Sequence, residues 1–316
     1  MSKTTSLGLL ALLFAAFSGV PAAGSAENEH KAVLVTGASS GIGLKITEHL
    51  SANGFFVYAG ARKAEDLAAL DALENVKSVR LDVMIQEDID NAVRMISEAG
   101  RGLYGLVNNA GVGIAGDATA MTEEDLHFTM NVNVYGPYRV TRAFAPLIIE
   151  STGRITTIGS ISGVLSGRSL ASYSMSKHAV ESYTDSLAAE MEDHGVAVSV
   201  VEPGNYQSRI RHKVVADAKA KDLPDERIAA LEAWRDTDFK EPDEVAEAVH
   251  DFLVSDNPGR RYMVVPNERE AEITIRKIIE ETVQLNQHQP YKYDRDALVR
   301  MLDEALSSLE AAPDSD

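Results

Sequence analysis

The chain has 316 residues, of which 45% are hydrophobic and 25% are charged, a balance typical of globular proteins rather than disordered ones. The formal net charge of −18 at pH 7 argues against nucleic-acid binding through a basic surface. The absence of cysteine excludes disulfides and cysteine-ligated metals. The eight histidines lack the spacing of a metal site, so no metal is expected.

The N-terminus has the features of a secretory signal peptide. Lys3 precedes an apolar run over residues 7–17, and small residues follow up to a plausible cleavage site after Ala26. The run is short for a membrane span, although extended to Ala23 it could act as an uncleaved anchor. Residues 1–26 therefore predict export, for example to a periplasm, or membrane anchoring, and we expect membrane association only through them. If the start is assigned too early, a cytoplasmic location follows.

The first folded unit reads as a strand, a glycine turn and a helix. Residues 30–36 are continuously apolar at their centre, and an amphipathic helix is predicted over 44–53. Between them, Gly41 lets the backbone approach a pyrophosphate and Gly43 allows close packing of helix on strand. The Gly-x-x-x-Gly-x-Gly spacing departs from the usual dinucleotide fingerprint. The cofactor-binding residues expected here are Gly37, Ser39, Ser40, Gly41, Ile42 and Gly43.

The end of the second strand, predicted over 55–60, indicates the type of cofactor. Enzymes that use NAD often place a carboxylate here on the ribose 2′-hydroxyl, but this chain has Arg62 and Lys63. Two cations suit a 2′-phosphate better. We therefore predict a preference for NADP(H), with Arg62 as its main contact, and NAD(H) as a possible substitute. The alternative is a solvated Arg–Lys pair.

The next part of the chain continues to alternate between helix and strand. A helix from Thr122 to about Ile149 contains Pro137, which removes a hydrogen bond to the carbonyl of Asn133 and predicts a kink there. A freed carbonyl in a polar cavity can hold a water molecule. The elements expected before this helix are a helix over 64–73, a strand within 76–83 that ends at Asp82, a helix over 86–99, a strand over 103–107 and a turn over 108–111.

The helix predicted over 171–194 carries a pair of residues with an evident chemical use. Tyr173 and Lys177 are four residues apart and share one helix face. An adjacent ammonium favours the phenolate, so we expect Lys177 to lower the pKa of Tyr173 and to allow proton transfer near neutral pH. Ser160 follows the strand predicted over 153–159, at the sheet edge where ligands bind; Ser162 competes for its role.

The C-terminal third extends this alternating pattern. It predicts a strand over 196–201, a charged helical segment over 209–240 with Trp234 and Phe239 as apolar anchors, a helix over 241–254, a strand over 260–266, and helices over 268–285 and 294–309. Alternation of strand and helix predicts one parallel sheet covered on both faces. We expect one domain over 30–266, with residues 267–316 as its helical extension.

Together these motifs resemble the short-chain dehydrogenase/reductase family over about residues 31–266. The resemblance rests on the Thr-Gly-x-x-x-Gly-x-Gly turn, Asn-Asn-Ala-Gly at 108–111, Asn133, Ser160 with Tyr173 and Lys177, and the Pro-Gly turn at 203–204. It implies a Rossmann-like doubly wound sheet of about seven strands in the order 3-2-1-4-5-6-7. It also implies hydride transfer between NADP(H) and a carbonyl or secondary alcohol.

The resemblance also assigns roles to single residues. Ser160 would hold the carbonyl oxygen, Tyr173 would transfer the proton, Lys177 would bind the nicotinamide ribose, and Asn133 would hold a water. Residues 209–240 would form a substrate lid, and the helices near 122–150 and 172–194 would build a homodimer or homotetramer. Further cofactor contacts implied are Asp82 and Val83 beside the adenine, Asn109, Ala110 and Gly111 along the cofactor, and Pro203, Gly204 and Ser208 beside the nicotinamide.

Two alternatives remain at this stage. A nucleotide-binding sensor or scaffold could keep the fold and lose the chemistry, although the intact Asn133, Ser160, Tyr173 and Lys177 argue against it. An epimerase or dehydratase on the same fold usually needs a larger substrate domain than the residues after Pro266 supply. The substrate expected is a small-molecule carbonyl or alcohol, and a bulky apolar one is a guess by resemblance.

Overall fold

The computed structural model describes residues 31–310, and its centre is a seven-stranded parallel sheet with the order β3-β2-β1-β4-β5-β6-β7. This confirms the predicted Rossmann-like sheet. The signal-like segment, residues 1–26, lies outside the described residues. The strands are β1 Lys31–Val35, β2 Phe55–Ala61, β3 Val76–Arg80, β4 Gly105–Asn108, β5 Arg154–Ile158, β6 Ala197–Pro203 and β7 Arg261–Val264.

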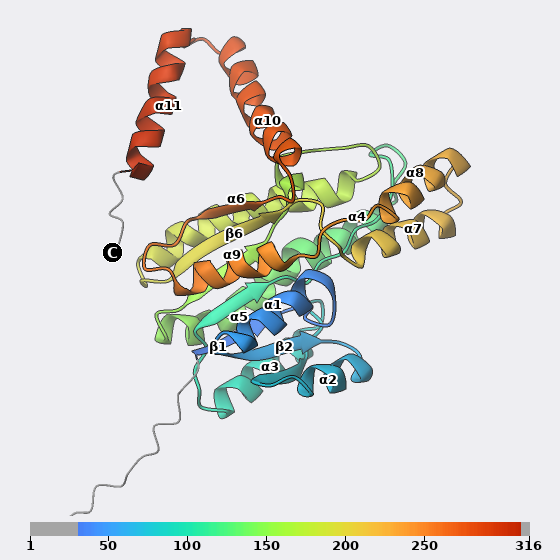
Figure 1. The fold of residues 1–316 in the computed structure, drawn as a ribbon, viewed down its shortest axis with the longest axis vertical. Helices are drawn as coiled ribbons and strands as arrows, with labels where there is room; N and C mark the ends of the chain where they lie inside the picture. The colour runs from blue at the N-terminus through green and yellow to red at the C-terminus, as the bar shows by residue number, and fades with distance from the viewer. Residues whose placement is uncertain (1–30, 311–316) are drawn as a thin grey trace, which may run out of the picture.

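Helices cover both faces of the sheet (Figure 1). One face carries α1 Gly41–Ala52, α2 Ala64–Asp71 and α9 Asp243–Val254. The other face carries α3 Gln86–Glu98, α5 Gly136–Glu150 and α6 Ala171–Glu192. Each parallel strand is joined to the next in the chain by a connection that returns over one face of the sheet. The helices in these connections form the two layers.

The alternation of side chains along β1 divides the core in two. Ala32 and Leu34 pack with α3 and α5, while Val33 and Val35 pack with α1 and α9. All four are buried, which explains why this strand is continuously apolar in sequence. Each helical layer therefore has its own hydrophobic core.

The long helix predicted over 122–149 consists of three segments. Thr122 caps α4 Glu123–Met130, a π-helical turn spans Asn131–Tyr135, and α5 follows. Pro137 lies in the first turn of α5. The irregular turn thus falls where the missing proline N–H predicts it, because the carbonyls before a proline lose their regular donors.

The third strand is shorter than predicted and ends at Arg80 rather than Asp82. Local hydrogen bonds end it. Asp82 Oδ1 accepts from the Met84 N–H at 3.0 Å, and the Asp82 N–H donates to Asp88 Oδ2 at 3.0 Å. An aspartate that bonds the backbone two residues on favours a turn over a strand.

Two helical additions lie outside the layers. The segment expected to be a lid, called the lid below, consists of α7 Ile210–Ala220 and α8 Asp225–Arg235. The C-terminal extension consists of α10 Glu268–Gln287 and α11 Arg295–Glu310. The extension projects away from the sheet (Figure 1). Its base is fixed where Glu270 Oε2 accepts from the Asn205 N–H at 2.8 Å. Within residues 31–310, no helix has the length and hydropathy needed to cross a membrane.

The core beneath α5 gives a test of the packing. Phe144 is fully buried there, so Phe144→Ala is expected to lower the free energy of unfolding by about 3–5 kcal/mol in urea denaturation. Phe128 on α4 is 41% exposed, and Phe128→Ala serves as the control. Similar losses in the two variants would contradict the described core.

Candidate active site

A cavity of about 700 Å³ opens at the carboxyl edge of the sheet. It lies where the loops after β1 and β4 diverge to opposite sides, the usual ligand position in doubly wound sheets. Every predicted site residue except Asn133 lines it. These residues are Gly37, Ser39, Ser40, Gly41, Ile42, Gly43, Arg62, Asp82, Val83, Asn109, Ala110, Gly111, Ser160, Tyr173, Lys177, Pro203, Gly204 and Ser208.

The glycine turn has no room for side chains. Gly37 and Gly41 have φ values of +66° and +55°, a region that favours glycine. A Cβ on Gly43 would lie 2.3 Å from Asn109 Nδ2 and 2.4 Å from the Gly37 carbonyl oxygen. Asn109 also donates to the Thr36 carbonyl at 2.9 Å. The turn therefore offers bare backbone at the start of α1, a cradle that fits a pyrophosphate.

Cations gather at the β2 end of this cavity. Arg62 and Lys63 line it as predicted, and Arg62 Nη1 lies 3.5 Å from Asp82 Oδ2. Arg209 and Lys213, at the start of the lid, line it as well. Neither residue was predicted as a cofactor contact, because their segment was expected to form the substrate lid alone. The sequence feature that could have indicated them is the repeat of a basic residue at every second position after Ser208.

Lys177 is directed toward the sheet. Its Nζ donates to the Ile158 carbonyl at 2.7 Å and lies 5.6 Å from the centre of the Tyr173 ring. The side chain is 6% exposed. Burial lowers the pKa of Lys177 to about 8, and the nearby Glu181 carboxyl opposes that shift. A lysine with such a pKa can exchange a proton near neutral pH.

Tyr173 and Ser160 lie side by side in the cavity. Burial raises the pKa of Tyr173, and a hydrogen bond with Ser160 opposes the rise. This direction is opposite to the lowering expected from Lys177. Burial of the phenol is the larger cause of the shift, and the Lys177 ammonium donates to the Ile158 carbonyl. Ser160 Oγ accepts from the Ser162 N–H at 3.1 Å and donates to the Pro203 carbonyl at 3.4 Å. Of the two candidate serines, Ser160 is the one in contact with Tyr173.

Asn133 lies behind the cavity wall, buried in the π-helical turn. Its Oδ1 accepts from the Val112 N–H at 2.8 Å, and its Nδ2 donates to the Val112 carbonyl at 2.9 Å and to Ser176 Oγ at 3.0 Å. The side chain therefore fixes the loop after β4 against α6. Ser176, which precedes Lys177, was not among the predicted site residues.

A buried group of carboxyls lies beneath the Ser160 loop. Arg261 Nε is 3.6 Å from Glu181 Oε2 and 3.7 Å from Glu202 Oε1. Glu181 Oε1 lies 2.8 Å from the positions that a Cβ on Gly159 or Gly163 would occupy, so both glycines are required by this contact. Burial, together with the charge of Glu202, raises the pKa of Glu181 to about 8.

This raised pKa predicts a pH effect on stability. An acid whose pKa rises from 4.5 to about 8 on folding stabilises the fold at low pH and loses that contribution as the pH rises to about 8. We expect Glu181→Gln to gain stability relative to the unsubstituted protein between about pH 5 and about pH 8.5, measured by urea denaturation. Glu190→Gln, at an exposed position of α6, is the control. A constant difference across this range would refute the expectation.

Comparisons with known proteins agree with this geometry. The family model described as short chain dehydrogenase matches residues 31–219. The mitochondrial D-beta-hydroxybutyrate dehydrogenase of Bos taurus is 33% identical over 261 residues, covering 73% of this chain and 76% of the relative. An uncharacterized oxidoreductase of Escherichia coli is 32% identical over 236 residues, covering 74% and 85%.

Solved structures give the same result. A short-chain dehydrogenase from Streptomyces avermitilis has a TM-score of 0.69 and 27% identity, covering 81% of this chain and 95% of that one. A short chain dehydrogenase from Burkholderia cenocepacia in complex with NADP has a TM-score of 0.64 and 26% identity, covering 82% and 98%. The chain therefore belongs to the short-chain dehydrogenase/reductase family, whose members act on CH–OH groups with NAD(P).

Proposed function

We propose that this protein is an NADP(H)-dependent oxidoreductase that interconverts a carbonyl and a secondary alcohol. The observation that carries the proposal is that Ser160, Tyr173 and Lys177 line the same cavity as the glycine turn and Arg62. The NADP-bound relative from Burkholderia cenocepacia supports the type of cofactor. The glycine turn would hold the pyrophosphate, and Arg62 the 2′-phosphate.

In the proposed mechanism the cofactor supplies or accepts the hydride. Ser160 Oγ holds the carbonyl oxygen and stabilises the charge that develops there. Tyr173 has a raised pKa and is therefore a neutral phenol, ready to donate a proton to that oxygen in the direction of reduction. Lys177, whose pKa is about 8, binds the ribose and returns the proton, through a water held at the Asn133 carbonyl.

The lining of the cavity favours a largely apolar substrate. Beyond Tyr173 its lining includes Leu165, Ile210, Val214 and Trp234. Arg211 also lines it, but its guanidinium donates to the Gln207 side chain and to three carbonyls at the end of α8. An uncharged carbonyl compound therefore fits better than one whose carboxylate must be bound here.

The location and assembly of the protein complete the proposal. Residues 1–26 would direct export or membrane attachment, and α4, α5 and α6 would form the interface of a homodimer or homotetramer. Exposed apolar side chains on these helices, among them Tyr138 and Met175, support such an interface. Sequencing of the native N-terminus and mass measurement in solution test these two points.

Removal of the phenol hydroxyl tests the chemistry. Tyr173→Phe is expected to lower NADPH-dependent turnover of a carbonyl panel by about 10²–10⁴-fold, the usual contribution of a general acid. Binding of NADPH, measured by fluorescence titration, should change little. Turnover close to that of the unsubstituted protein would refute the mechanism, and no turnover of any carbonyl by the unsubstituted protein would favour an inactive scaffold.

Charge reversal at the end of β2 tests the cofactor preference. Arg62→Asp is expected to lower the ratio of kcat/KM with NADPH to kcat/KM with NADH by about 10- to 100-fold, from the roughly 1.5–3 kcal/mol of a charge-assisted hydrogen bond. Arg94→Asp, at an exposed residue on α3 that does not line the cavity, provides a control for long-range charge. An unchanged ratio for Arg62→Asp would refute the assignment.

A further inference from the structure

Four cations from two distant parts of the chain line one end of the cavity. Arg62 and Lys63 follow β2, and Arg209 and Lys213 belong to the start of the lid. This concentration of positive charge occurs in a protein whose formal net charge is −18. Like charges brought together repel, and the arrangement is favourable only where an anion binds among them.

The acidic groups nearby neutralise only part of this charge. Arg62 pairs with Asp82 at 3.5 Å, and Lys63 pairs with Glu65 at 3.4 Å. Across residues 31–310, neither Arg209 nor Lys213 forms an ion pair. Burial lowers the pKa of Lys213, and the charges of Arg62, Arg209 and Lys63 lower it further. Lys213 thus lies in the electrostatic field of the very cations proposed to hold the 2′-phosphate.

An adjacent face of α7 carries apolar side chains that line the same cavity. Ile210 and Val214 side chains lie 3.0 Å and 3.1 Å from the position of a Cβ on Gly113, and Tyr173 Cδ2 lies 3.9 Å from it. Val214 is fully buried and follows Lys213 directly in the chain. A contact made by Lys213 would therefore fix the position of side chains that lie close to Tyr173.

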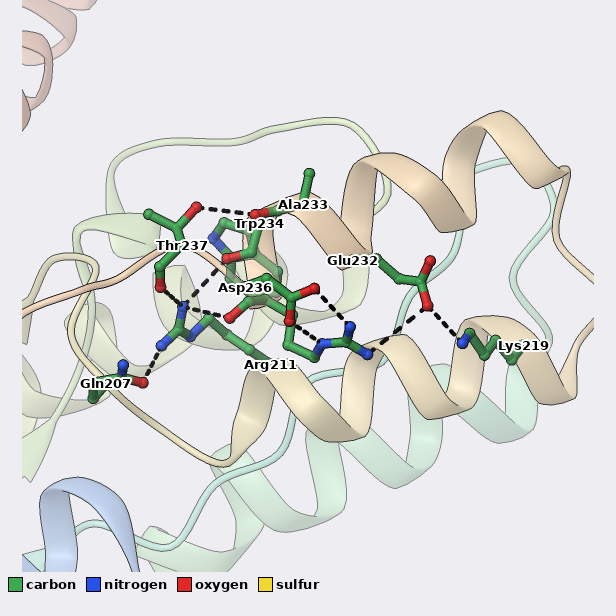
Figure 2. A network of polar contacts seen from close by, with 9 residues as sticks. Gln207, Arg211, Lys219, Glu232, Ala233, Trp234, Asp236 and Thr237 are labelled. Carbon is green, nitrogen blue, oxygen red and sulfur yellow. Dashed lines mark hydrogen bonds and ion pairs between the residues drawn. The ribbon is translucent and has the colours of Figure 1, made fainter.

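The lid transmits such a contact because α7 and α8 are tied together. Figure 2 shows the guanidinium of Arg211, on α7, directed at the end of α8. It donates to the carbonyls of Trp234, Arg235 and Thr237 at 3.1–3.2 Å, and it stacks on Phe239, with 4.3 Å between the guanidinium carbon and the ring centroid. Trp234 in turn lines the cavity. The two helices therefore respond as one unit to a contact at Lys213.

We infer that Lys213 binds the 2′-phosphate of NADP(H) from the lid side, opposite Arg62, and thereby positions the lid over the substrate. This inference rests on the proposed NADP(H) dependence. It makes Lys213 both a determinant of cofactor specificity and a positioning residue for the substrate cavity. NADP(H) would then order the lid more strongly than NAD(H), because only NADP(H) carries the 2′-phosphate.

The test uses Lys213→Gln in the full chain. We expect the Kd for NADPH to rise by about 10-fold, as for the loss of one charge-assisted contact, while the Kd for NADH stays within about twofold. The substrate KM should rise with NADPH and stay constant with NADH. Limited proteolysis should show that NADPH protects residues 209–240 in the unsubstituted protein and protects them less in the variant.

Lys219→Gln is the matched control. It also removes a positive charge from α7, but Lys219 pairs with Glu232 at 2.6 Å, and we expect no change in the ratio of the two cofactor affinities. Equal losses of NADPH and NADH affinity in Lys213→Gln, or no loss of either, would overturn the inference. If Arg62→Asp shifts the cofactor ratio and Lys213→Gln does not, only this inference fails. If Arg62→Asp has no effect, the proposed NADP(H) dependence fails first.

Discussion

The site depends on the close contact between Asn109 and the glycine turn. Asn109 Nδ2 donates to the carbonyls of Thr36 and Gly37, while Thr36 Oγ1 accepts from the backbone N–H groups of Asn109 and Ala110. These bonds join the ends of β1 and β4, the neighbouring strands between which the strand order reverses. Because Gly43 lies against the same amide, the start of α1 is held beside the cavity. Any side chain at Gly43 would separate the helix from the strand.

A second constraint is the burial of charge behind the proposed catalytic residues. Lys177 is held by a backbone carbonyl, and Glu181 and Glu202 lie beneath the Ser160 loop around Arg261. Burial favours the neutral form of an ionisable group, so it raises the pKa of a carboxyl or phenol and lowers the pKa of a lysine. Tyr173 is therefore a neutral phenol, the pKa of Lys177 is about 8, and the pKa of Glu181 is about 8. Lys177 and Glu181 therefore lie close to a protonation change near neutral pH, whereas Tyr173 stays protonated there.

The lid links the two ends of the cavity. Its first helix places cations near the end of β2 and apolar side chains near Tyr173. A helix can do both because residues one position apart point in different directions. The buried Arg211 holds this helix to the next one by donating to the last carbonyls of α8. The lid can thus connect the proposed recognition of a cofactor phosphate with the shape of the substrate site.

Local sequence determined the glycine turn, the order of strands and helices, the irregular turn before Pro137 and the pairing of Tyr173 with Lys177. Each of these depends on backbone conformation or on spacing within one element, which a few neighbouring residues fix. The strand that ends at Arg80 was predicted too long, because the competing bonds of Asp82 include one to Asp88 in the next helix. The length of an element is often decided by such small differences in energy.

Only the tertiary structure decided which charged side chains line the same cavity. Arg62 and Lys213 are far apart in sequence, and the sequence does not show that both line one cavity. It also predicted the wrong direction for the Tyr173 pKa, because spacing along a helix shows that a lysine is near but not how far the phenol is removed from solvent. Solvation and long-range electrostatics depend on the whole fold, whereas the motifs depend on local geometry. The sequence by itself therefore determined the family and the residues around the reaction, and the fold determined their protonation and how the lid joins them.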